Sequence, residues 1–242
     1  SQLAAPAKEC AGARAPARHP APTPPRSSSA EIPDGKELVM NCHPGEHGTL
    51  EGGPLLMDRP EDAPAFMPWP STTVESNGPV SNRVDIVFVG DGFQAAQLPS
   101  WASVVAERWA TMASREPIVS YRRYFNAHRV DVESVDGGVD NDPTQGIARN
   151  TALDMAFWCG GTERLLCVNT SKAAAAAANA PQWDQIVAVA NSSKYGGAGY
   201  SASEISTFSA FNAQSLEVAL HELGHSFGDL ADEYDYGASS ST

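Results

Sequence analysis

The strongest constraint on the fold of this chain is a pair of histidines, His221 and His225, that stand four residues apart. An α-helix advances about 100° per residue, so residues at i and i+4 lie on one face, one turn apart. Two imidazole nitrogens on that face can bind one metal ion, each at about 2 Å. The spacing therefore predicts a helix with a metal-binding face.

Glu222 directly follows the first histidine and completes the pattern H-E-x-x-H. A carboxylate at this place can take a proton from a metal-activated water without itself binding the ion. The pattern is typical of zinc-dependent peptidases. The alternative, a surface helix with two solvated histidines, leaves the adjacent acid and the carboxylates further along the chain unexplained.

The flanking residues predict that this helix covers 215–228. Ser215 is a candidate N-cap, Glu217 suits the positive end of the helix dipole, and Gly228 would end the helix in a left-handed conformation. An apolar stripe at helical spacing would face a core, and it consists of Leu216, Ala219, Leu220, Leu223 and Phe227. A turn after the helix would swing three acids back toward the metal: Asp229, Asp232 and Glu233.

The composition limits the partners of the chain. Its 242 residues carry a formal net charge of −13, which argues against nucleic acid or an anionic membrane as the principal partner. No apolar stretch reaches the roughly 18–20 residues of a membrane span.

Four cysteines indicate an oxidising, extracellular location, because disulfides persist there. Cys10, Cys42, Cys159 and Cys167 permit two disulfides with three possible connectivities. Cys159 and Cys167 are the easier pair, since a short loop can bring them together.

Three segments differ in composition. Residues 1–30 are rich in Ala, Pro, Arg and Ser, which predicts a disordered leader. Residues 31–80 contain many Pro and Gly and predict a loop-rich extension, with a possible short strand at 37–41. We expect the catalytic domain to cover 82–236.

Within this domain, strand and helix patterns alternate, which predicts an α/β fold. The strands that we expect lie at 84–89, 128–135 and 185–190, the last of them buried on both faces. We also expect three helices: one after Ser100, one at 150–157 and one through Ala173. Residues 202–211 would form an edge strand, to which an extended peptide could add.

Several motifs together resemble one family. Residues 221–234, HELGHSFGDLADEY, look like the signature of the IgA-peptidase family of zinc metallo-endopeptidases, the igalysins. Residues 84–93, VDIVFVGDGF, are similar to the opening strand of that family, and CGGTERLLC at 159–167 and NSSKYGG at 191–197 also resemble its members. The likeness extends over roughly residues 83–236. It implies a metzincin-like twisted sheet packed on helices, with an active-site helix at 215–228.

The resemblance also implies roles for individual residues. His221 and His225 would bind zinc, and Glu222 would be the general base. Metzincins usually place the third ligand, His or Asp, three residues after the glycine that ends the helix, where this chain has Ala231. We expect Asp232 to replace it, rather than Glu233, because aspartate is the substitute known in the wider group.

The chain departs from the metzincins in one respect. Metzincins have a methionine-containing turn beneath the metal, after the third ligand, whereas the last methionine here is Met155. We therefore expect that the C-terminal part of the catalytic domain is missing from this sequence; the alternative is a metal floor of different construction.

The function expected from these features is that of a secreted zinc endopeptidase acting on a protein or peptide substrate. One alternative is a catalytically silent binding module in which the metal only staples the fold. The retained Glu222 argues against it, because a structural zinc site needs no base and usually has four protein ligands. Another alternative is a hydrolase of a non-peptide bond such as a cell-wall amide, but no sequence feature favours this function.

Overall fold

The computed structural model describes residues 33, 35–44, 50–58 and 67–231. Contacts divide the chain into Ser1–Glu31 and Ile32–Thr242, and all described residues belong to the second unit. The leader predicted at 1–30 thus lies outside the described residues. No described helix has both the length and the apolar character needed to cross a membrane.

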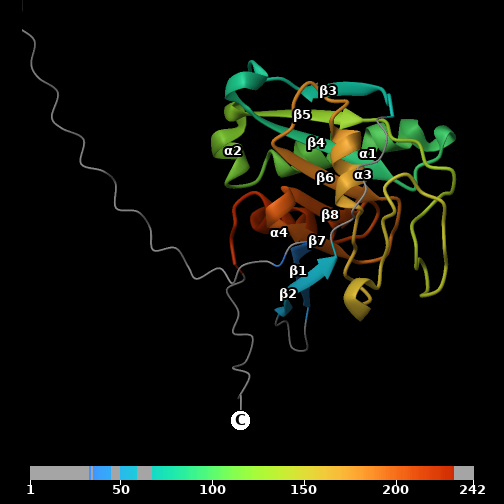
Figure 1. The fold of residues 1–242 in the computed structure, drawn as a ribbon. Helices are drawn as coiled ribbons and strands as arrows, with labels where there is room; N and C mark the ends of the chain where they lie inside the picture. The colour runs from blue at the N-terminus through green and yellow to red at the C-terminus, as the bar shows by residue number, and fades with distance from the viewer. Residues whose placement is uncertain (1–32, 34, 45–49, 59–66, 232–242) are drawn as a thin grey trace, which may run out of the picture. The chain divides into compact units, whose positions relative to one another are not determined.

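A mixed sheet of eight strands is the centre of this unit (Figure 1). The strands are β1 (Lys36–Pro44), β2 (Leu50–Asp58), β3 (Ser71–Glu75), β4 (Val84–Asp91), β5 (Phe125–Val130), β6 (Gln185–Ala190), β7 (Gly197–Tyr200) and β8 (Ile205–Ser209). Their order is β2-β1-β7-β8-β6-β4-β5-β3. The strands β5, β4, β6 and β8 pair in parallel, and the remaining pairs are antiparallel.

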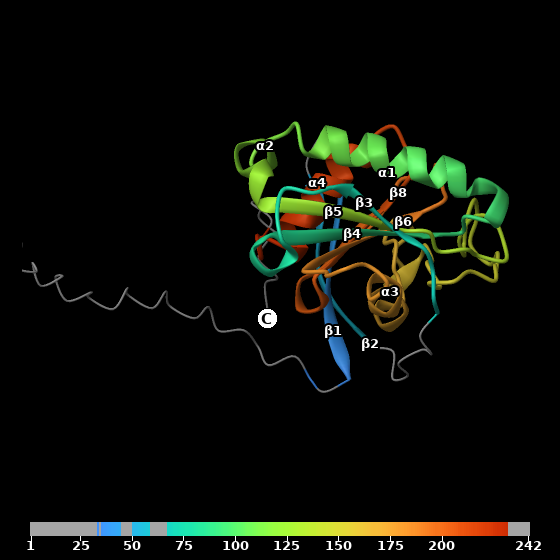
Figure 2. The same cartoon turned by 90° about the horizontal axis from the view of Figure 1, so that it is seen from above.

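Four helices accompany the sheet: α1 (Leu98–Met112), α2 (Ile118–Tyr121), α3 (Thr170–Ala177) and α4 (Ser215–Ser226). The helices α1 and α4 pack on one face of the sheet and α3 on the other, as Figure 2 shows for α1 and α3. The predicted α/β architecture, a twisted sheet packed on helices, is confirmed. The helix through Ala173 and the predicted helix that carries the two histidines are confirmed as well. The helix expected after Ser100 is α1, which begins earlier, at Leu98, so that Ser100 lies inside it.

The central strands are apolar because both of their faces are covered. In β4, Ile86 and Phe88 face the core beneath α1, where Trp101 packs, while Val87 and Val89 face the core beneath α3. All six residues of β6 are buried, as predicted for residues 185–190.

Two predicted elements were wrong or displaced. The strand expected at 128–135 is β5, which begins and ends earlier. No helix forms at 150–157, because the backbone there is held by Asp91, a buried side chain at the end of β4. Its carboxylate oxygens accept hydrogen bonds from the backbone N–H groups of Leu153 (2.9 Å) and Met155 (2.8 Å).

The edge strand expected at 202–211 was also wrong. The strand found there, β8, lies between β6 and β7 in the interior of the sheet. Its sequence looks half-exposed because it contains Ser206, Thr207 and Ser209, all of which are buried. The Thr207 hydroxyl donates to the Leu166 carbonyl at 2.7 Å, which satisfies one of these polar groups inside the protein.

The range 31–80, expected to be rich in loops, contributes three strands to the sheet. The possible strand at 37–41 is part of β1, which pairs with β2 along its whole length and with β7 at a single position, Met40 opposite Gly199. Three of the Gly and Pro residues that indicated loops, Gly52, Gly53 and Pro54, lie in β2, at the outer edge of the sheet. Proline is tolerated at such an edge because its missing N–H can face away from the partner strand.

A test of the opposite edge of the sheet concerns Glu75, which ends β3. The guanidinium of Arg122 donates two hydrogen bonds to its carboxylate, at 2.9 and 2.7 Å, and lowers its pKa from 4.5 to about 2. A carboxyl whose folded pKa is depressed stabilises the fold above its unfolded pKa and loses that contribution as the pH falls through its folded pKa. We therefore expect Glu75→Gln to lower the free energy of unfolding at pH 7. Acidification from pH 4.5 to pH 2 should then cost the variant less stability than it costs the parent.

Urea unfolding at several pH values between 7 and 2 measures this effect. Glu107→Gln is the matched control, since Glu107 has a 69% exposed side chain paired only with its neighbour Arg108. A parallel loss of stability in the parent and the Glu75 variant over the acid range would contradict the assigned role.

Candidate metal centre

The helix α4 begins at Ser215, but this residue does not act as an N-cap acceptor. Its hydroxyl donates to the backbone carbonyls of Ser209 and Asn212 instead, and Gln214 precedes the helix. These bonds tie the start of α4 to the end of β8. Glu217 lies in the first turn, where its charge suits the helix dipole, as expected.

The end of α4 also differs from the prediction in detail. The residue in the left-handed conformation is Asp229 (φ 49°), not Gly228. The N–H groups of Gly228 and Leu230 both donate to the Gly224 carbonyl at 3.1 Å. Gly228 is needed for space, because a Cβ there would lie 2.8 Å from that carbonyl oxygen.

The two histidines converge on one point, as their spacing predicts. The Nε2 atoms of His221 and His225 lie 3.0 Å apart, and the ring planes are nearly perpendicular at 89°. Two imidazole ligands of one tetrahedral zinc ion would have their nitrogens about 3.3 Å apart, given bonds of about 2.0–2.1 Å. The pair thus has the separation that a shared divalent ion requires.

A backbone carbonyl fixes the orientation of the His225 ring. Its Nδ1 atom lies 2.7 Å from the backbone carbonyl oxygen of Leu230, so Nδ1 carries the proton and donates it. Nε2 then presents its lone pair toward His221. A backbone carbonyl leaves no mark in a sequence, and the sequence could not have identified this partner.

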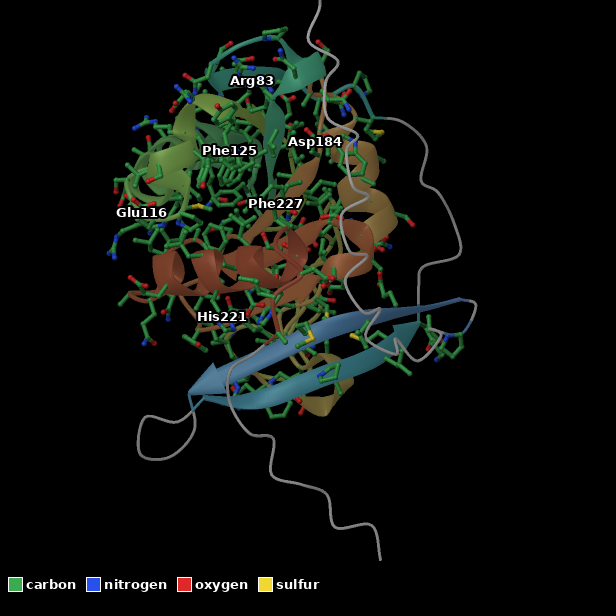
Figure 3. All side chains as sticks on the ribbon, turned by 90° about the vertical axis from the view of Figure 1, so that its left-hand side faces the viewer. Arg83, Glu116, Phe125, Asp184, His221 and Phe227 are labelled. Atoms are coloured by element: carbon green, nitrogen blue, oxygen red, sulfur yellow. A yellow bond between two sulfur atoms is a disulfide. The ribbon has the colours of Figure 1, made fainter. Side chains whose placement is uncertain are left out.

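Glu222 lies next to the histidines in a nearly dry setting. It is 2% exposed, and one ligand atom from each of His221, Glu222 and His225 lies within 4.8 Å of the others. Among the described residues, these three form the group of His, Cys, Asp or Glu side chains that could hold a metal ion. Figure 3 shows His221 on the side of α4 that faces the hairpin β1–β2, and Phe227 on the opposite side, toward Phe125.

The electrostatic environment near the end of α4 favours a cation. Burial, and then the neighbouring Asp229 carboxylate, raise the pKa of Glu204. Burial likewise raises the pKa of Tyr200, and the nearby charges of Glu37 and Glu222 raise it further, so the Tyr200 phenol stays neutral. Acidic groups gathered in this way attract a divalent ion.

Two glycines of β7 let α4 approach the sheet closely. A Cβ on Gly199 would lie 2.8 Å from the Cβ of His225, and a Cβ on Gly197 would lie 2.5 Å from the Cγ1 of Val218. The sequence alone suggested a loop at 196–199, because glycines weaken strands. The structure shows that they are the contact surface for the helix.

Polar bonds anchor the last turn of α4 to the sheet. The Gln185 side chain donates to the Ser226 hydroxyl at 2.9 Å, and the Ser201 hydroxyl donates to the His225 carbonyl at 3.0 Å. All three side chains come from different elements, and no sequence pattern connected them.

The outer edge of β7 is already paired. The N–H of Gly197 donates to the Arg164 carbonyl at 3.3 Å, and the Gly197 carbonyl accepts from the N–H of Leu166 at 3.4 Å. Gly199 faces Met40 of β1. The segment with Arg164 is held by the disulfide Cys159–Cys167, which confirms the predicted pairing.

The remaining predicted site residues lie outside the described residues. These are the third ligand, for which we expected Asp232, and the alternative, Glu233. Cys10 lies outside them as well, and the side chain of Cys42 is not described.

The model of a family described as IgA Peptidase M64 matches residues 72–242. This match includes α4 and the strands from β3 onward, and it begins after the hairpin β1–β2. No curated protein matches the chain.

The tight contact between β7 and α4 leads to a prediction for Gly199→Ala. The added methyl group would meet His225, so we expect α4 to shift, the melting temperature to fall and metal affinity to drop at least tenfold. Gly224→Ala is the matched control, because a Cβ there meets only Leu230, at 3.7 Å. Alanine in a helix interior should stabilise by up to about 1 kcal/mol.

Both variants can be followed by thermal denaturation and by metal titration with a competing chelator. Equal metal affinity in the two variants would show that the glycine contact does not position the histidines.

Proposed function

Because the chain belongs to the IgA peptidase M64 family, a family of metallopeptidases, we propose that it is a zinc-dependent endopeptidase with Glu222 as general base. One observation carries the proposal. The Nε2 atoms of His221 and His225 meet at 3.0 Å while the Leu230 carbonyl holds His225 in the tautomer that a metal ligand needs.

The donor set fits zinc. Imidazole nitrogens and a carboxylate oxygen are ligands that zinc accepts, and a catalytic site has three protein ligands and one open position. When bound, such an ion would activate water and polarise the scissile carbonyl. His221 and His225 would supply two of the ligands.

Glu222 would move the proton. As the water oxygen attacks the peptide carbonyl carbon, the carboxylate would take one of the protons of the water, and it would pass this proton to the leaving amine as the C–N bond breaks. The products are a carboxylic acid and an amine, so the atoms balance. Burial of Glu222 supports this role, because bulk water then competes less for the proton.

Asp232 is our proposal for the third ligand. The turn at Asp229 and Leu230 reverses the chain after α4, and the Leu230 carbonyl already contacts His225. This contact supports a third ligand from the residues that shortly follow Leu230 in the chain. Asp232 has a shorter side chain than Glu233 and precedes it in the chain.

We also propose that the protein works outside the cell. The disulfide Cys159–Cys167 supports this, since such bonds persist in oxidising surroundings. A catalytically silent, metal-stapled module is the second candidate. The buried Glu222 beside the histidines speaks against it, because a purely structural site has no use for that carboxylate.

Substitution of Glu222 tests catalysis separately from metal binding. We expect Glu222→Gln to lower kcat on an unstructured protein substrate by at least a thousandfold while the metal content, measured by elemental analysis, stays at one zinc per chain. His221→Ala should lose both metal and activity. Full activity in the Glu222 variant, or a metal-replete parent that cleaves no peptide, would exclude the proposed mechanism.

The choice of third ligand can be tested by a matched pair of variants. We expect Asp232→Asn to weaken zinc binding by tenfold or more and Glu233→Gln to change it less than threefold. Competition with a chromogenic chelator measures both. The reverse order would assign the ligand to Glu233.

A further inference from the structure

A second polar pocket lies near the start of β7, apart from the histidines. It has a volume of about 510 Å³ and is lined by Trp158, Thr162, Glu163, Arg164, Lys194 and Tyr195. We call it the Arg164 pocket. Its walls come from the disulfide-closed loop on one side and from the connection between β6 and β7 on the other.

Two hydrogen-bond donors in its walls have no acceptor within the described protein. These are the Nε of Arg164 and the indole Nε1 of Trp158, both shielded from solvent. Buried donors are nearly always paired, since leaving one unpaired is costly. Two such donors on the same side of one pocket indicate a ligand with acceptor oxygens.

The charge of the pocket has the matching sign. Among the described residues, no carboxylate lies within ion-pair distance of Arg164. Lys194 does pair with Glu163 at 3.0 Å, but the Glu163 side chain is 58% exposed and that of Lys194 only 16%. An ion pair with one partner in solvent is weak, so the two cations leave a net positive pocket. Burial lowers the pKa of Arg164, and the charge interaction with Tyr195 opposes this shift only in part.

The pocket is rigid. The carbonyl oxygen of Arg164 would lie 2.6 Å from a Cβ on Gly196, so this glycine allows the two segments to touch. The Lys194 ammonium lies 4.9 Å from the centre of the Phe157 ring, which holds its charge in place. The disulfide Cys159–Cys167 closes the loop that contains Arg164, and Trp158 directly precedes this loop. A ligand therefore meets donors that are already ordered.

The pocket is also close to the catalytic glutamate. Gly197 bonds to the backbone of Arg164, and a Cβ on the same glycine would lie 3.1 Å from the Cγ of Glu222. Neighbouring strands lie about 4.8 Å apart. An extended peptide advances about 3.3 Å per residue, so the pocket is within roughly two to four residues of a bond cleaved beside Glu222.

We propose that the Arg164 pocket binds a carboxylate of the peptide substrate, an acidic side chain or the C-terminal carboxylate, near the cleaved bond. This rests on the proposed peptidase function, which it deepens by naming a substrate class. Arg164 would form a paired hydrogen bond to the two carboxylate oxygens, Lys194 would supply a second charge, and the Trp158 indole would donate a further hydrogen bond.

Binding to the full chain with Glu222→Gln tests the pocket without cleavage. The probes are fluorescent peptides with a single Glu placed two to four residues to either side of the central bond, and the same peptides with Gln. We expect at least one Glu peptide to bind about tenfold more tightly than its Gln counterpart. Arg164→Gln and Lys194→Gln should each remove that preference.

Lys172→Gln is the control, since it removes one positive charge from α3, where Lys172 pairs with Asp154. It should keep the preference for Glu. Equal binding of all Glu and Gln peptides would overturn the proposal, and so would loss of the preference in the Lys172 variant. If glutarate or inorganic phosphate binds the pocket as tightly as the best peptide, the site serves a free anion and the peptide assignment is wrong.

Cleavage by the parent chain separates the two proposals. A preference for Glu in binding, together with a rise in KM but an unchanged kcat for Arg164→Gln, supports both. A preference in binding without any cleavage would remove the peptidase function but leave the carboxylate pocket.

Discussion

The close contact between β7 and α4 is the constraint on which the rest of the site depends. Because Gly197 and Gly199 lack side chains, the helix lies directly on the strand, and His225 and Glu222 are held against the backbone of the sheet. The helix is then fixed at both ends, by Ser215 at its start and by Gln185 and Ser201 at its last turn. The geometry of the two histidines follows from this packing rather than from the helix alone.

The part of the site that the sequence predicted depends on local periodicity. Two histidines four apart on a helix must share a face, and an apolar stripe must find a core, so His221, His225 and their helix were predicted correctly. Local periodicity could not identify the groups that hold the two histidines in place. The Leu230 carbonyl has no side-chain signature, and the glycines of β7 gain their meaning only from a helix that lies some twenty residues later in the chain.

Two of the errors in the fold share one physical origin, which is hydrogen bonding between residues far apart in the sequence. Residues 150–157 were expected to be helical, but their N–H groups bond to Asp91, about sixty residues earlier. β8 was expected at an edge, yet it lies inside the sheet, where the Thr207 hydroxyl finds its acceptor at Leu166. The hairpin β1–β2 was obscured by glycine and proline, which an outermost strand tolerates. In contrast, the doubly buried strands β4 and β6 have uninterrupted apolar runs at 86–89 and 186–190 and were found without difficulty.

The covered margin of β7 has a consequence for selectivity. Main-chain ladders recognise every polypeptide alike, because all peptides present the same N–H and carbonyl groups. Here the groups of Gly197 and Gly199 on that margin are engaged by the chain's own residues, Arg164, Leu166 and Met40. Because these groups are already in use, a peptide strand cannot pair with β7 at these two positions, which leaves side-chain contacts as the means by which this region could distinguish one peptide from another.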